Sequence, residues 1–146
     1  MFWRKKDKVE APKQIAIIRA YLSASFPLVR GKVANPSVRV AVQVFVLGMA
    51  DMMRQAENLT YEQFVVIYSS ILSEIGLSPA MGAASFIQLV GETAQRNESV
   101  RKLVAHGAQS VRCFVAQRDT DAPTDLIEAV LFGEKNAHAL LELVDT

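Results

Sequence analysis

The side chains that most often bind metals or act as nucleophiles are scarce in this chain, which has one cysteine and two histidines in 146 residues. The single thiol, Cys113, excludes an intrachain disulfide framework and is typical of a reducing compartment, so we expect a cytoplasmic protein. His106 and His138 fall in different predicted helices, with no cysteine or glutamate at ligand spacing. We therefore expect no metal site and no cofactor.

Catalytic motifs are also missing. The sequence contains no glycine-rich phosphate loop, no nucleophile elbow and no Glu-x-x-His pair. His106 and Cys113 share one helix face, but two turns separate them by roughly 10 Å, too far for a thiol and its base to hydrogen-bond. His106 is interpreted as a polar-face histidine beside Lys102 and Gln109. We expect no catalytic residue and no enzymatic activity.

Long uncharged apolar runs are absent as well. The most apolar segment, residues 40–50, lies between Arg39 and Asp51 and is shorter than the roughly 18 residues that a spanning helix needs. The basic amino terminus is followed by an apolar stretch that Arg19 interrupts, with no small-residue cleavage site after it. We expect neither a membrane span nor an export signal.

What the chain does have is a hydrophobic fraction of 51% and a valine at positions 38, 40, 42, 44 and 46. Such alternation is typical of a strand. However, Asn35 is a favoured N-cap and Pro36 a favoured first helical residue, and no other segment alternates to supply a partner strand. On a helix, one narrow polar edge would collect Arg39, Gln43, Ala50, Arg54 and Glu57, with Val46 as its apolar exception. Residues 36–57 are therefore predicted to form a buried central helix.

The remaining segments also have helical patterns. Thr60 and Gln63 form a capping-box pair, and Gly76 is suited to end the helix that they start. The sequence predicts an all-α fold: a compact bundle of about six helices around the central helix, in a single domain over residues 13–146. The other predicted helices cover residues 13–25, 61–75, 79–96, 98–118 and 124–144, the last being either one helix or two helices broken at Gly133.

Residues 71–89 follow the outline of a helix-turn-helix, which makes a DNA-binding regulator a minor alternative. A recognition helix needs positive charge and donors for phosphates and bases. Between Arg54 and Arg96 there is no lysine or arginine. Nucleic acid is therefore not an expected partner.

Charge is distributed unevenly although the formal net charge is only +1. Nine basic and two acidic residues precede position 40, whereas seven acidic residues and one lysine follow position 118. Either the two ends neutralise each other within the fold, or the first twelve residues form a mobile basic arm. Such an arm would make weak contact with an anionic membrane surface, with nucleic acid or with the acidic end of another copy of the chain. The residues assigned to that contact are Phe2, Trp3, Arg4, Lys5, Lys6 and Lys8.

These observations favour a protein that acts by binding. Apolar residues beyond those that the predicted core needs suggest an interaction or adaptor protein that forms a homodimer and binds another protein. The residues assigned to the interface are Val46, Val66 and Ile67. The alternative is a carrier or sensor of a small apolar ligand held between helices, since adaptable methionines suit such a pocket. The residues assigned to that pocket are Phe45, Met49, Met52, Met53 and Phe86.

Overall fold

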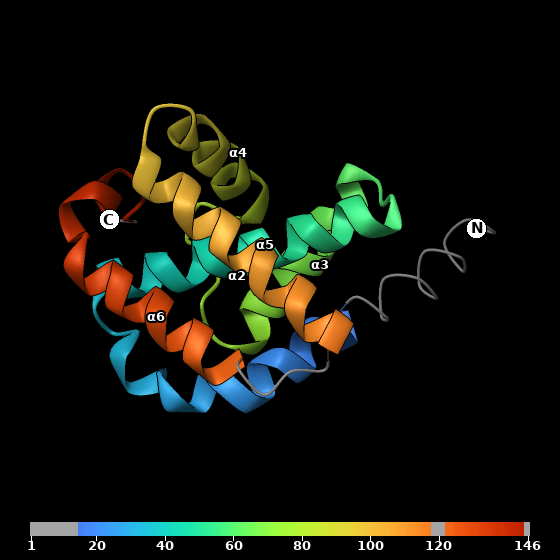
Figure 1. The fold of residues 1–146 in the computed structure, drawn as a ribbon. Coiled ribbons are helices and arrows are strands. Elements are labelled where there is room, and N and C mark those ends of the chain that lie inside the picture. The colour runs from blue at the N-terminus through green and yellow to red at the C-terminus, as the bar shows by residue number, and fades with distance from the viewer. Residues whose placement is uncertain (1–14, 118–121, 145–146) are drawn as a thin grey trace.

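The chain folds into helices joined by turns, as the computed structural model shows for residues 15–117 and 122–144 (Figure 1). Within these two ranges there is no strand, which confirms the predicted all-α class. Residues 15–25 are helical. They are followed by the 3-10 helices η1 (Phe26–Leu28) and η2 (Arg30–Lys32), the α-helices α2 (Pro36–Glu57), α3 (Tyr61–Glu74), α4 (Ala83–Ala94), α5 (Glu98–Gln117) and α6 (Ala122–Lys135), and the 3-10 helix η3 (Ala137–Leu143).

Helix α2 is the central helix, with the predicted bounds. The Asn35 side chain accepts a hydrogen bond of 3.0 Å from the Ser37 N–H, and Pro36 occupies the first turn. Helices α5, α6 and α3 all pack against α2, and Figure 1 shows α5 crossing in front of it. Of the described helices, α2 alone is long and apolar enough to cross a membrane, but 78% of that apolar window is buried within the protein. Helix α2 is therefore buried to the extent expected of a core helix in a folded domain.

Glycines mark the places where α2 lies closest to its neighbours. A Cβ atom added at Gly48 would overlap the Val104 carbonyl oxygen of α5, and one added at Gly107 would overlap the Phe45 carbonyl oxygen of α2. On the other side, a Cβ atom at Gly133 of α6 would lie 3.0 Å from the Ser37 carbonyl oxygen. The two backbones at each crossing can approach only because these positions have no side chain.

The predicted polar edge of α2 is wrong over its middle, where Gln43, Val46 and Ala50 are buried. The turn that follows α3 covers part of this edge and supplies polar partners to it. Gln43 Nε2 donates a 2.6 Å hydrogen bond to the Leu77 carbonyl oxygen, and the Tyr68 hydroxyl donates one of 2.7 Å to the Gln43 carbonyl oxygen. A polar side chain on this edge therefore joins two helices instead of contacting water.

Two other boundaries differ from the prediction. Helix α4 begins at Ala83 and not at Pro79, because Gly82 has φ of 93° and ψ of 154°, a conformation that no helix contains. The last segment is two helices, but the break follows Lys135 and not Gly133. By contrast, the capping box of Thr60 and Gln63 at the start of α3 is confirmed.

Candidate ligand-binding groove

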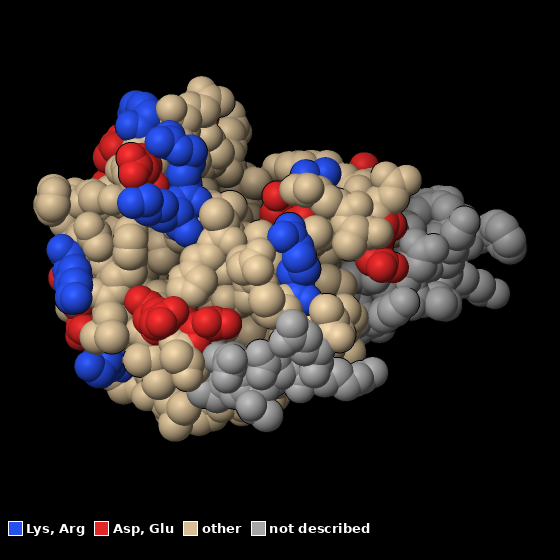
Figure 2. Space-filling model, viewed as in Figure 1, with Lys and Arg blue, Asp and Glu red and all other residues tan. Residues whose placement is uncertain are grey.

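An apolar groove of about 480 Å³ opens between four helices, α2, α3, α4 and α5. The outline of the molecule in Figure 2 is indented between α4 and the part formed by the end of α2 and the start of α3. The groove is lined by Leu47 and Asp51 of α2, Phe64 of α3, Ile87, Val90, Gly91 and Ala94 of α4, and Arg101, Val104, Ala105 and Ala108 of α5.

The two long walls of the groove have the same helical spacing. On α4 the lining positions are 87, 90, 91 and 94, and on α5 they are 101, 104, 105 and 108. Each set lies on one face of its helix, because residues three and four apart are neighbours on a helix surface. Half of these eight residues are glycine or alanine, so the two facing surfaces leave open the space that larger side chains would fill. Leu47, Phe64 and Val90 are the buried members of the lining.

The corner between α4 and α5 sets the relative position of the two walls. Asn97 accepts a hydrogen bond of 3.2 Å from the Val100 N–H and donates one of 2.8 Å to the Ala139 carbonyl oxygen in η3. Its neighbour Arg96 pairs with Glu142, also in η3. These contacts anchor the corner to the last described element, so the walls meet at one fixed end of the groove.

The two charged residues of the lining already have partners. Asp51 pairs with Arg54 at 2.9 Å and accepts a 2.8 Å hydrogen bond from Gln55. Arg101 donates a 2.7 Å hydrogen bond from Nη1 to the Ala94 carbonyl oxygen. The Asp51 carboxylate thus has a cationic partner, whereas the Arg101 guanidinium is held by a neutral carbonyl group, and the rest of the groove presents apolar surface.

The five residues that the sequence assigned to an apolar pocket do not line this groove. Phe45, Met49, Met53 and Phe86 are buried in the hydrophobic core. Met52 is partly exposed, and its sulfur lies 3.1 Å from Arg112 Nη2. The groove uses the neighbouring faces of the same elements, Leu47 of α2 and Ile87 of α4 among them.

The three residues assigned to an interface differ in how far they are buried. Val46 and Ile67 are fully buried within the chain, whereas the Val66 side chain is 54% exposed. The basic arm, with its six assigned residues, lies outside the described residues.

Lys32 and Glu134 form an ion pair of 3.6 Å, which joins the basic first part of the chain to its acidic last part. Part of the charge asymmetry is thus balanced inside the fold.

His106 does not lie on the open polar face that the sequence predicted for it. His106 packs its ring edge-to-face against Phe45, with centroids 5.2 Å apart, and its Nε2 atom faces carboxylates of α6. The only trace of this arrangement in the sequence is the spacing of Asp125 and Glu128, which places both on one face of a helix. Which helix would face them could not be read from the sequence.

Comparisons of the whole chain with protein-family models, with curated proteins and with solved structures find no significant match.

Proposed function

We propose that this protein is a non-enzymatic, cytoplasmic binding protein that holds a small, uncharged apolar ligand in the groove between α2, α3, α4 and α5. The observation that carries the proposal is the combination of size and lining. About 480 Å³ lies within the range of roughly 300–1,000 Å³ typical of small-molecule sites, and nine of the eleven lining residues are apolar.

The chemistry of the walls favours a hydrocarbon-rich molecule. Burial of each CH₂ group contributes about 0.8 kcal/mol, so a ligand with around ten such groups gains roughly 8 kcal/mol before the entropic costs of binding are subtracted. A charged ligand is disfavoured, because most of the lining is apolar and burial of an unpaired charge is costly. An uncharged ligand meets no such penalty.

Native mass spectrometry of untagged protein purified from cells tests this function. We expect a species heavier than the bare chain by a small mass that is released on denaturation, and organic extraction then identifies the ligand. Incubation of the stripped protein with 1-decanol should restore a one-to-one adduct. A bare chain that takes up no decanol would contradict the proposal.

Self-association, as a protein-interaction module, is a second candidate function. Ile127 and Leu131 lie one turn apart on α6 and are 38% and 43% exposed, and Val66 of α3 is exposed as well. Large apolar side chains that share an exposed helix face are typical of interfaces. Light scattering at micromolar concentration should give twice the chain mass, and Leu131→Glu should return it to the mass of one chain. A single chain mass for the unaltered protein would exclude the dimer.

A further inference from the structure

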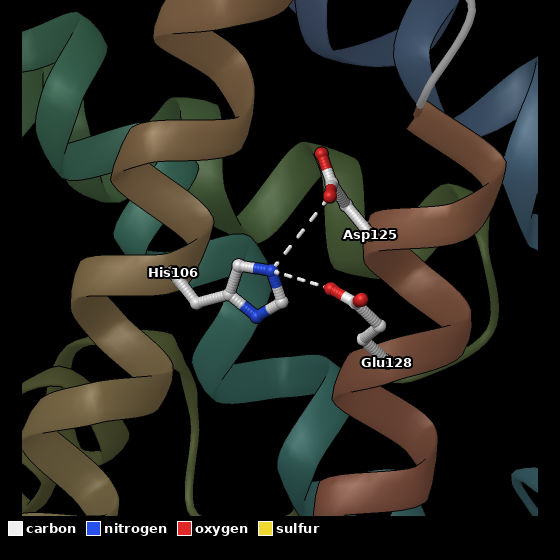
Figure 3. A group of neighbouring side chains, drawn as sticks. All are labelled: His106, Asp125 and Glu128. Atoms are coloured by element: carbon white, nitrogen blue, oxygen red, sulfur yellow. Dashed lines mark ion pairs between the residues drawn. The ribbon is translucent and has the colours of Figure 1, made fainter.

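A cluster of three potential metal ligands lies where α5 packs against α6, away from the groove. His106 Nε2 of α5 is 3.5 Å from Glu128 Oε1 and 3.8 Å from Asp125 Oδ1 of α6, and the three ligand atoms all lie within 4.8 Å of one another. Figure 3 shows both carboxylates pointing from α6 toward the same nitrogen of the imidazole ring. Two helices thus direct one nitrogen and two oxygen atoms to a common point.

The position of each side chain has a structural cause. The imidazole of His106 is held by the edge-to-face contact with Phe45, which is fully buried in α2. Asp125 and Glu128 are three residues apart on α6 and therefore lie on the same side of it. The side chains of His106 and Asp125 are about 30% exposed and that of Glu128 is 58% exposed, so one side of the cluster is open to solvent.

Two buried hydroxyl groups near the cluster have no hydrogen-bond partner. Ser110, one turn beyond His106 on α5, and Tyr21 of the first helical segment are buried, and neither hydroxyl forms a hydrogen bond with any described residue. Burial raises the pKa of the Tyr21 hydroxyl. The nearby Ser110 hydroxyl lowers this pKa in part, although the two groups do not meet hydrogen-bond geometry. The negative charges of Asp125 and Glu128 raise the pKa further. A buried hydroxyl without a hydrogen-bond partner lowers the stability of the fold, and the surrounding hydrophobic core offers no partner to these two hydroxyls.

We propose that His106, Asp125 and Glu128 bind a divalent transition-metal cation of the Zn²⁺ class. Bonds of about 2.0–2.2 Å from Zn²⁺ to nitrogen and oxygen, at tetrahedral angles, place ligand atoms roughly 3.3–3.6 Å apart. The two distances to His106 Nε2 need only small side-chain adjustments to reach these values, and the two carboxylate oxygens, which lie within 4.8 Å of each other, can approach by rotation of their side chains. The charges of the site and the ion also match, because two carboxylates balance the two positive charges of a divalent cation.

The donor set selects among metals. One imidazole nitrogen with two carboxylate oxygens suits Zn²⁺, Mn²⁺ or Fe²⁺, whereas Cu⁺ prefers sulfur and Ca²⁺ takes six to eight oxygen ligands. Three protein ligands leave room for water in the coordination sphere.

Calorimetric titration of the full, untagged chain with Zn²⁺ tests the site. We expect one ion per chain and a loss of affinity of at least about tenfold in Glu128→Gln and in Asp125→Asn, since each removes one of three ligands. The matched control is Glu134→Gln on the same helix, whose partner is Lys32, and Cys113→Ser controls for the thiol; both should bind like the unaltered chain. Because Glu128 is mostly exposed, its variant should melt at the same temperature as the unaltered protein when no metal is present.

The two histidines allow a second readout that does not depend on affinity. In nuclear magnetic resonance spectra, one equivalent of Zn²⁺ should shift the ring signals of His106 and leave those of His138 in place. The proposal is overturned if the unaltered chain gives no binding heat, if Glu128→Gln and Asp125→Asn retain full affinity, or if the signals of His138 respond in place of those of His106.

Discussion

Gly48 of α2 and Gly107 of α5 face each other's helix at the point where the two backbones are closest. Each glycine lies against a carbonyl group of the opposite helix, Val104 for Gly48 and Phe45 for Gly107. The contact is reciprocal, so neither helix can carry a side chain there without separation of the pair. This crossing positions α5, and α5 in turn forms one wall of the groove and carries His106.

Alanine at either crossing glycine should therefore destabilise the fold. Gly→Ala in an exposed helix normally stabilises by roughly 0.5–1 kcal/mol, but overpacking costs about 1–3 kcal/mol or more where the opposing atoms are backbone. We expect Gly48→Ala and Gly107→Ala to lower the free energy of unfolding in urea. The matched control is Gly91→Ala on α4, where an added Cβ meets nothing within 4 Å and the helix should gain stability. Equal gains in all three variants would contradict the close crossing.

Charge introduced into the central helix should unfold the protein. Val42 and Phe45 are fully buried, so Val42→Asp or Phe45→Asp would bury an unpaired carboxylate at a cost of about 3 kcal/mol or more, a large part of a typical domain's stability. Circular dichroism melting measures the effect. Val115→Asp is the control, because that side chain is 49% exposed and its melting temperature should change little. Unchanged melting of both core variants would show that α2 is not the core helix.

Alkaline pH should destabilise the protein through its buried tyrosines. Burial raises the pKa of Tyr21 and of Tyr68 above the ordinary value of about 10. Below pH 10 both the folded and the unfolded chain hold these protons. Above it only the unfolded chain releases them, so the free energy of unfolding falls as the pH rises.

Phenylalanine variants separate the two tyrosines. Tyr68→Phe removes the hydrogen bond to the Gln43 carbonyl oxygen and should cost about 1 kcal/mol at neutral pH. Tyr21→Phe removes a buried hydroxyl that has no hydrogen bond and should leave the free energy of unfolding at neutral pH unchanged or raise it. Both should weaken the alkaline loss of stability in urea titrations, whereas Tyr61→Phe, with an exposed ring, should behave like the unaltered chain. A steeper alkaline loss in either core variant would refute the assignment.

Local sequence rules were sufficient for elements whose ends are set by their own residues. The Asn35 cap and Pro36 predict the start of α2, and Thr60 with Gln63 predicts the start of α3; in both cases the side chain makes the expected hydrogen bond. The predicted start of α4 at Pro79 is wrong, because Gly82 has a backbone conformation that no helix contains, and the helix begins only after it.

The groove and the histidine cluster depend on how helices pack, and this is not a local property. In the sequence, the wall positions of α4 and α5 cannot be told from the other positions of two amphipathic helices, because only the corner at Asn97 fixes how the two helices face each other. His106 and Glu128 each look like a polar surface residue until α5 and α6 meet. In both cases the sequence contains the residues, whereas the rotation of one helix against another gives them a shared site.

The basic arm should supply weak, salt-sensitive attraction to anionic membranes. About 1 kcal/mol per basic residue is available near such a surface, and salt screens it. We expect the full chain to bind anionic vesicles in a flotation assay at low salt, and deletion of Met1 to Lys8 to abolish this binding. The deletion should leave the melting temperature within a few degrees of that of the full chain. Unfolding of the shortened chain would make the arm part of the structure, and vesicle binding that survives the deletion would place the contact elsewhere.

The most direct test of the ligand-binding account is a fluorescence titration with the neutral apolar dye Nile red, applied to the unaltered chain, Gly91→Phe and Ala84→Phe. Gly91 lines the groove and has open space beside it, so a phenylalanine there should fill the groove without strain in the helix. Ala84 lies on the same helix, is exposed and does not line the groove. The account predicts saturable one-to-one binding to the unaltered chain and to Ala84→Phe, with at least about tenfold weaker binding to Gly91→Phe, the loss expected when roughly 1.4 kcal/mol of contact is removed. Equal binding to all three proteins, or binding to none, would contradict it.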